Sequence, residues 1–255
     1  MSRLLGALVA LVYAFLYGPI LVLLLTSFNA ARYATRWEGW TLDWYRSLLG
    51  NQLLVDAALR SLLVATVAAS AATVLGTLGA VALYRFRFRG REGLQGLLFI
   101  TMMMPDIVMA ISLLVLFIVL AIPLGFWSLL PAHVTFCLPF VVVTVLARLS
   151  SFDRALLEAA RDLGAGEWAV FRRVILPLSL PAVAAGWLLA FTLSLDDVIV
   201  SFFVTGPEYE ILPLKIYSMV RLGVKPEVNA LAALMFLVPL AAVSAAHILL
   251  REKER

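Results

Sequence analysis

Three acidic residues lie within long apolar stretches of the sequence. Asp106 lies inside the apolar stretch 94–121, and Asp196 and Asp197 lie inside the apolar stretch 180–204. An ionised carboxylate at the depth of a lipid bilayer costs about 2.5 to 3.5 kcal/mol, so an acid in such a position needs a partner. A cation in transit could be that partner, because carboxylates replace the hydration that the cation loses.

Polar neighbours of the adjacent acids fall on two different helix faces. At 100° per residue, Ser194, Asp197 and Ser201 share one face, and Thr192 shares another with Asp196. Only one of the two acids therefore needs to face a cation. The structural alternative stays open, since intramembrane acids often cap kinks or pair with an arginine of a neighbouring helix.

A second acidic cluster follows a turn at Gly206 and Pro207. It consists of Glu208, Tyr209 and Glu210, which combine two carboxylates with an aromatic face. Such a combination can bind an organic cation. Two exposed carboxylates are equally common in solvated loops, so both interpretations stay open.

Several common reactive motifs are absent from the sequence. It contains no phosphate-binding P-loop, no serine-hydrolase elbow and no HExxH zinc helix, so we expect any dependence on ATP to come from a partner. His133 and Cys137 are four residues apart, but a zinc site needs three or four ligands. We predict no enzyme activity, and no metal or cofactor in this chain.

The polar segment 150–181 is patterned as two short helices. Asp153 is placed to cap the first helix, Gly164 to end it, and Glu167 to begin the second. We expect Pro177 and Pro181 to close the segment, because proline removes a backbone donor. A helix pair of this kind offers a place where a soluble partner can dock.

The spacing within this segment resembles the EAA loop in the permease subunits of type I ABC importers, whose pattern is EAA-x3-G-x9-I-x-LP. The matching residues are Glu158, Ala159, Ala160, Gly164, Val174, Ile175, Leu176 and Pro177, with Val174 in place of the usual isoleucine. The resemblance implies that the segment carries coupling helices that dock on a cytoplasmic ATPase. The ATPase-coupling residues that it implies are Glu158, Ala159, Ala160, Asp162, Leu163, Gly164 and Ala165.

Other segments extend the resemblance over nearly the whole chain, to the second permease subunit of the spermidine/putrescine importers. They are residues 81–90, 105–112, 135–140, 191–198 and 204–215. The family implies a heterodimer with a second permease subunit, two ATPase subunits that bind ATP and Mg, and an extracytoplasmic polyamine-binding protein. The substrate-path candidates are then Asp106, Asp196, Asp197, Ser194 and Ser201, and the candidates for delivery on the outer side are Glu208, Tyr209 and Glu210.

Membrane helices must position these residues, because the chain is too apolar for a soluble domain. Of its 255 residues, 63% are hydrophobic and only 14% are charged. Six apolar stretches stand out, at 6–28, 57–84, 94–121, 131–149, 180–204 and 229–250. We predict an all-α polytopic membrane protein with about six transmembrane helices, and the resemblance implies the type I ABC importer permease fold.

The basic residues predict the orientation of these helices. With six spans, the segments on the side of the two termini contain more Lys and Arg than those on the other side, which places both termini in the cytoplasm. The cluster at Arg85, Arg87, Arg89 and Arg91 is then a cytoplasmic membrane anchor. The basic residues are otherwise dispersed, so we expect the lipid bilayer, and no nucleic acid, as a partner.

The short segments between the stretches predict one transmembrane domain over residues 1–255. Within it, residues 57–250 form the core permease region and residues 150–181 form the coupling segment. We predict the permease subunit of an ATP-driven polyamine importer in the bacterial inner membrane, working by alternating access. The alternatives are an importer permease for another small solute, an ion-coupled secondary transporter, and a membrane scaffold.

Overall fold

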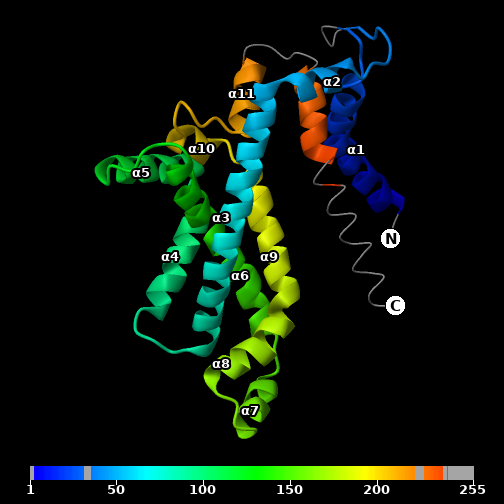
Figure 1. Ribbon diagram of the computed structural model, residues 1–255. Helices are drawn as coiled ribbons and strands as arrows, with labels where there is room; N and C mark the ends of the chain where they lie inside the picture. The colour runs from blue at the N-terminus through cyan, green and yellow to red at the C-terminus, as the bar shows by residue number, and fades with distance from the viewer. Residues whose placement is uncertain (1–2, 32–35, 222–226, 238–239, 241–255) are drawn as a thin grey trace. The chain divides into compact units, whose positions relative to one another are not determined.

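The computed structural model describes residues 3–31, 36–221, 227–237 and 240, and these are almost entirely helical (Figure 1). The helices are α1 (Arg3–Thr26), α2 (Asp43–Gly50), α3 (Gln52–Arg85), α4 (Arg91–Met103), α5 (Asp106–Val119), α6 (Phe126–Ser150), α7 (Arg154–Asp162), α8 (Glu167–Val170), the π-helix η1 (Phe171–Ile175), α9 (Leu176–Asp196), α10 (Ile199–Val204) and α11 (Leu212–Arg221). The described residues contain no strand beyond one isolated bridge, between Asn29 and Trp40. The predicted all-α class is confirmed.

Four of the described helices are long and apolar enough to cross a membrane. They are Leu5–Thr26, Gln52–Arg85, Phe126–Ser150 and Glu167–Asp196. The bent pair α4 and α5 raises the number to five if the pair counts as one span. The sixth predicted stretch, 229–250, lies for the most part outside the described residues, which include the apolar helix Glu227–Leu237.

The apolar stretch predicted at 94–121 is not one straight helix, because the chain turns sharply inside it. α4 and α5 meet at an angle of 112° across a break at Met104 and Pro105. Pro105 has no backbone N–H and disfavours the helical conformation in the residue before it, and Met104 is indeed extended. Asp106 therefore begins a new helix at the bend.

The stretch at 180–204 also needs correction, at both of its ends. Its helix begins much earlier, at Glu167, and runs to Asp196, where the chain breaks before α10. Pro177 and Pro181 do not close the coupling segment, because the π-helical turn η1 precedes them and changes the hydrogen-bonding register. The coupling segment thus continues directly into a membrane helix.

The chain divides into two compact units, of which the second, Ala57–Leu214, contains all the candidate site residues. In its core, the fully buried Ala69, Ala72 and Ala80 of α3 belong to one cluster with Val141 and Val145 of α6. A Cβ atom at Gly76 would lie 2.8 Å from Val141 Cγ1, so only glycine allows this approach. A second core cluster joins α5, α6 and α10 around Phe117, Leu129 and Val204.

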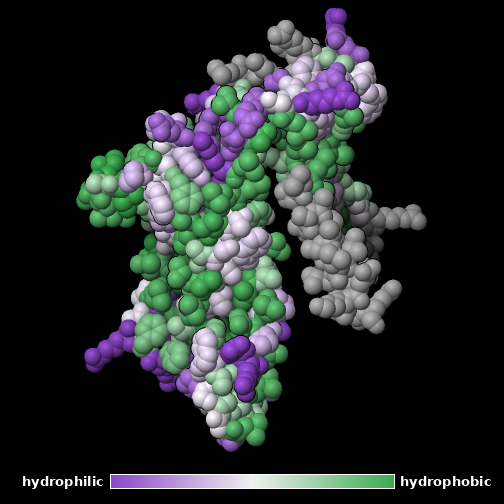
Figure 2. Space-filling view, in the orientation of Figure 1, coloured by the Kyte–Doolittle hydropathy of each residue, from purple (hydrophilic) through white to green (hydrophobic). Residues whose placement is uncertain are grey.

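The polarity of the surface of this unit changes along its length. Figure 2 shows apolar side chains over the middle of α3, α4 and α9, and polar side chains near α7 and α8 at the lower end. The first unit, Met1–Asp56 with Lys215–Arg255, holds its own polar contacts. Tyr45 and Ser27 are joined there by their hydroxyls at 2.6 Å, and Trp44 Nε1 donates to the Asn29 carbonyl at 2.8 Å.

Candidate functional site

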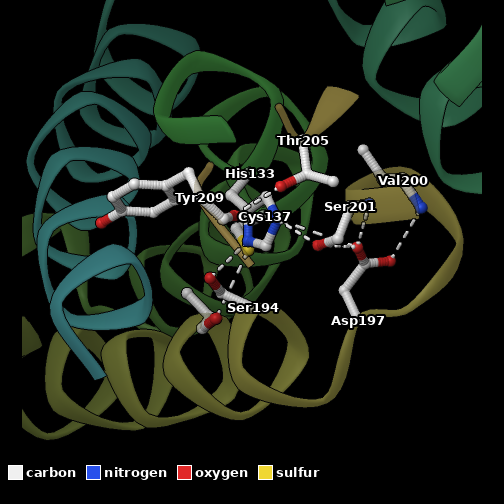
Figure 3. A network of polar contacts seen from close by, with 9 residues as sticks. His133, Cys137, Ser194, Asp197, Val200, Ser201, Thr205 and Tyr209 are labelled. Carbon is white, nitrogen blue, oxygen red and sulfur yellow. Dashed lines mark hydrogen bonds and ion pairs between the residues drawn. The ribbon is translucent and has the colours of Figure 1, made fainter. Parts of the chain in front are cut away.

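A buried polar network lies where α6 meets the break between α9 and α10 (Figure 3). His133 of α6 is hydrogen-bonded through Nδ1 to Ser194 Oγ at 2.7 Å and through Nε2 to Ser201 Oγ at 2.9 Å. Asp197 Oδ2 lies 3.7 Å from the same Nε2. We call these four residues the His133 network; none of them is more than 9% exposed.

For a neutral imidazole, the hydrogen bonds of the network have one consistent proton order. Ser201 Oγ donates to Asp197 Oδ2 at 2.8 Å, so it must accept from His133 Nε2–H. His133 Nδ1 then carries no proton and accepts from the hydroxyl of Ser194. A neutral imidazole protonated on Nε2 therefore satisfies both of its own nitrogens and both serine hydroxyls.

Asp197 caps the start of α10. Its carboxylate accepts the backbone N–H groups of Val200 at 3.2 Å and Ser201 at 2.7 Å, in addition to the Ser201 hydroxyl. These are N–H groups that the first turn of a helix leaves without a partner. Asp197 thus has the capping role that the sequence left open as the structural alternative.

The other two intramembrane acids lie outside the network. Asp196 is the last residue of α9, and its side chain is exposed in the isolated chain. Asp106 is the first residue of α5, directly after the 112° bend, and it is exposed as well. The structure therefore brings together Ser194, Asp197 and Ser201, and leaves Asp106 and Asp196 outside the network.

Sequence reasoning missed His133 as a member of this site, because it considered that residue only beside Cys137 as a metal ligand. Both ring nitrogens of His133 are engaged by serines. The Cys137 thiol instead donates to the Ala190 carbonyl of α9 at 3.3 Å. The available signal was a histidine inside an apolar helix, together with serines seven residues apart at 194 and 201.

The segment Thr205–Glu210 is fixed by contacts from α3. Arg60 Nη1 donates to the Glu208 carbonyl at 2.7 Å, and its guanidinium lies 5.0 Å from the centre of the Tyr209 ring. Burial raises the pKa of Tyr209, and Arg60 partly offsets that rise. Arg60 thus covers one face of the Tyr209 ring and holds the loop, and the neighbouring Glu208 is exposed.

The coupling segment has the local structure that its sequence predicts. Asp153 Oδ1 accepts the N–H of Ala155 at 3.0 Å before α7, and Gly164 after α7 has a φ of +79°, which favours glycine. Leu163 is 89% exposed and Glu158 is exposed. Leu156 and Trp168 are exposed beside it, at 49% and 68%, and a group of exposed apolar side chains on a polar tip is typical of a surface that another protein covers.

An ion pair joins the coupling segment to the end of α3. Arg85 Nη2 lies 2.6 Å from Glu167 Oε2, and the Arg85 side chain is only 5% exposed. Arg85 is therefore a structural residue as well as a member of the predicted basic anchor. Sequence reasoning did not find this pair, because 81 intervening positions separate the two residues.

Comparisons with known proteins agree on one family. Residues 72–252 match the family described as binding-protein-dependent transport system inner membrane component. The chain is 58% identical to the spermidine/putrescine transport system permease protein PotC of Escherichia coli, over 98% of this chain and 95% of that protein. It is 46% identical to the putrescine transport system permease protein PotI of Escherichia coli, over 88% of this chain and 82% of that protein.

The fold is also found among solved structures. A chain of a bacterial ABC transporter involved in the import of the acidic polysaccharide alginate matches with a TM-score of 0.76 and 18% sequence identity. The match covers 98% of this chain and 95% of that chain. At this identity the match establishes the fold alone.

Proposed function

The chain belongs to the family of binding-protein-dependent transport system inner membrane components, and we propose that it is the membrane-spanning permease subunit of an ATP-driven importer of spermidine and putrescine. The near-full-length identity to a spermidine/putrescine permease carries this proposal. Importers that share one fold transport different substrates, as the alginate transporter illustrates. The assignment of the substrate therefore depends on this sequence identity and on the acids described above.

The proposed topology has six spans and both termini in the cytoplasm of a bacterium. The four long helices, the bent pair α4 and α5, and the apolar sequence 229–250 together supply six. The excess of basic residues on the side of the termini supports the orientation. The whole chain is then one transmembrane domain, with its core permease region at 57–250.

The proposed partners follow from the family and from the coupling segment. A second permease subunit, two ATPase subunits that bind ATP and Mg, and an extracytoplasmic polyamine-binding protein complete the importer. The exposed Leu163 and Glu158 support docking of the ATPase on α7. ATP-driven closure of the ATPase pair then moves α7 and α8, and α9 continues directly from them.

We assign the cation-binding role in the path to Asp196 and Asp106. Both carboxylates are exposed in the isolated chain, whereas the Asp197 carboxylate already accepts three hydrogen bonds. A polyamine carries two or more positive charges, so two separated acids can hold two of its nitrogens. Ser194, Asp197 and Ser201 support the path by fixing the break beside Asp196.

Labelled spermidine uptake into proteoliposomes that hold this chain with its partners tests the function. We expect uptake that requires ATP and that excess putrescine inhibits, while an uncharged sugar leaves it unchanged. If the binding protein stimulates ATP hydrolysis but no polyamine is taken up, the chain is still an importer permease, but the assignment of polyamine as its substrate is wrong. Uptake in the absence of the ATPase would contradict the assignment to an ATP-driven importer.

A further inference from the structure

A polar pocket lies beside the coupling segment, at the loop that joins α3 to α4. It has a volume of about 290 Å³, and its lining includes Arg85, Arg87 and Arg91 together with Leu157 and Glu158 of α7. In Figure 1 this loop lies at the same end of its unit as α7 and α8. None of the proposed transport residues other than Glu158 takes part in the pocket.

The lining of this pocket has an excess of positive charge. Arg85 is neutralised by Glu167 at 2.6 Å, which leaves two arginines facing one carboxylate, that of Glu158. Among the residues that the structure describes, no carboxylate forms an ion pair with Arg87 or Arg91. The pocket is therefore suited to a group with negative charge.

Beyond Arg85 Nη2, which forms the ion pair with Glu167, two guanidinium nitrogens of the pocket residues have no hydrogen-bond partner in the described part of the chain. The Nε atoms of Arg85 and Arg91 are both buried, and neither donates to an acceptor in the described part of the chain. A buried donor without an acceptor costs about 1 to 3 kcal/mol, so an external acceptor would stabilise this arrangement. Arginine suits phosphate in particular, because its planar fork matches two phosphate oxygens.

The position of the loop indicates where such a phosphate comes from. The loop joins the ends of two apolar helices, and the exposed side chains of Phe86 and Phe88 alternate there with Arg85, Arg87 and Arg89. Aromatic side chains at a span end lie at the level of the lipid headgroups. We infer that the pocket binds the phosphate of an anionic phospholipid headgroup, and not that of a zwitterionic lipid, whose ammonium group the arginines would repel.

Lipid retention by the full-length chain tests this site without depending on transport. The purified chain is mixed with equal amounts of phosphatidylglycerol and phosphatidylcholine that have identical acyl chains, and bound lipids are counted by native mass spectrometry. We expect a preference for phosphatidylglycerol that falls about fivefold in Arg87→Gln and again in Arg91→Gln, as for the loss of one basic group near an anionic headgroup.

Arg89→Gln is the matched control, because Arg89 belongs to the same loop but does not line this pocket. It should retain the wild-type preference. Arg89 lines an adjoining pocket together with Arg87 and Arg91, so an equal loss in Arg89→Gln would move the headgroup there or show diffuse attraction. Either result would overturn the site, as would unchanged retention in Arg87→Gln. If inorganic phosphate alone displaces phosphatidylglycerol, the pocket binds free phosphate, and the assignment to a lipid headgroup is wrong. Arg85→Gln is avoided, because it also breaks the ion pair with Glu167.

Discussion

His133 is the residue on which the buried network depends, because it is the only member that contacts both α9 and α10. If the bonds form one connected chain, removing either serine weakens the bond that the other makes. In a double-mutant cycle with Ser194→Ala and Ser201→Ala, we expect the two losses of stability to deviate from additivity by about 0.5 to 3 kcal/mol. Thermal unfolding of the chain in detergent measures both. Strict additivity would contradict a shared network.

The adjacent acids Asp196 and Asp197 should respond to substitution in opposite ways. Asp197→Asn keeps only part of the cap on α10 and should lower the stability of the chain by about 0.5 to 2 kcal/mol. Asp196→Asn should leave the melting temperature unchanged and should strongly reduce spermidine uptake, because the carboxylate is exposed for a cation. The two variants are each other's control, measured by thermal unfolding and by uptake. Wild-type uptake in Asp196→Asn would show that this acid is not needed to bind the cation in the path.

At the scale of elements, the contact between α3 and α6 depends on Gly76. A Cβ atom at this position would lie 2.8 Å from Val141 Cγ1, whereas one at Gly79 would lie 3.7 Å from Val142 Cγ2, an ordinary contact. We expect Gly76→Ala to lower stability by about 1 to 3 kcal/mol, because a well-packed core resists an added methyl group. Gly79→Ala in the same helix should be neutral or slightly stabilising. Equal melting temperatures would contradict the tight packing of α3 on α6.

The tip of the coupling segment should bind the ATPase through Leu163. Its side chain is 89% exposed, so replacing it changes little inside this chain. Leu163→Asp should reduce the amount of ATPase that copurifies with the permease pair and should reduce uptake in proportion. Leu49→Asp is a suitable control, because Leu49 is also largely exposed, at 76%, and lies on α2. A variant Leu163→Asp that retains its ATPase would place the docking surface elsewhere.

At the scale of the whole molecule, the proposed topology predicts which side of the membrane each segment faces. In a Cys137→Ala background, Ser2→Cys and Glu254→Cys should react with a membrane-impermeant thiol reagent only from the cytoplasmic side. Glu208→Cys should react only from the opposite side, and it serves as the matched control in the same vesicles. Labelling of the two termini from opposite sides would contradict an even number of spans.

The sequence predicts the helical class, three of the long apolar helices and the ends of α7 well, because each depends on local composition or on a capping residue such as Asp153 or Gly164. It does not predict the bend at Pro105 or the break at Asp197, since a hydropathy pattern does not distinguish a continuous helix from two helices at an angle. The role of His133 depends on contacts between residues 61 and 68 positions apart, which no local pattern contains.

The continuous helix Glu167–Asp196 has a mechanical consequence. It is 30 residues long, about 45 Å at 1.5 Å per residue, and it carries the coupling segment at one end and the capped break at the other. On the proposed topology, a tilt of this helix at its cytoplasmic end moves its far end by an amount that the length of the helix sets. The tightest packing along it lies where Gly186 and Gly76 let the neighbouring helices approach Val141, and this contact is where we expect the helix to turn against α6.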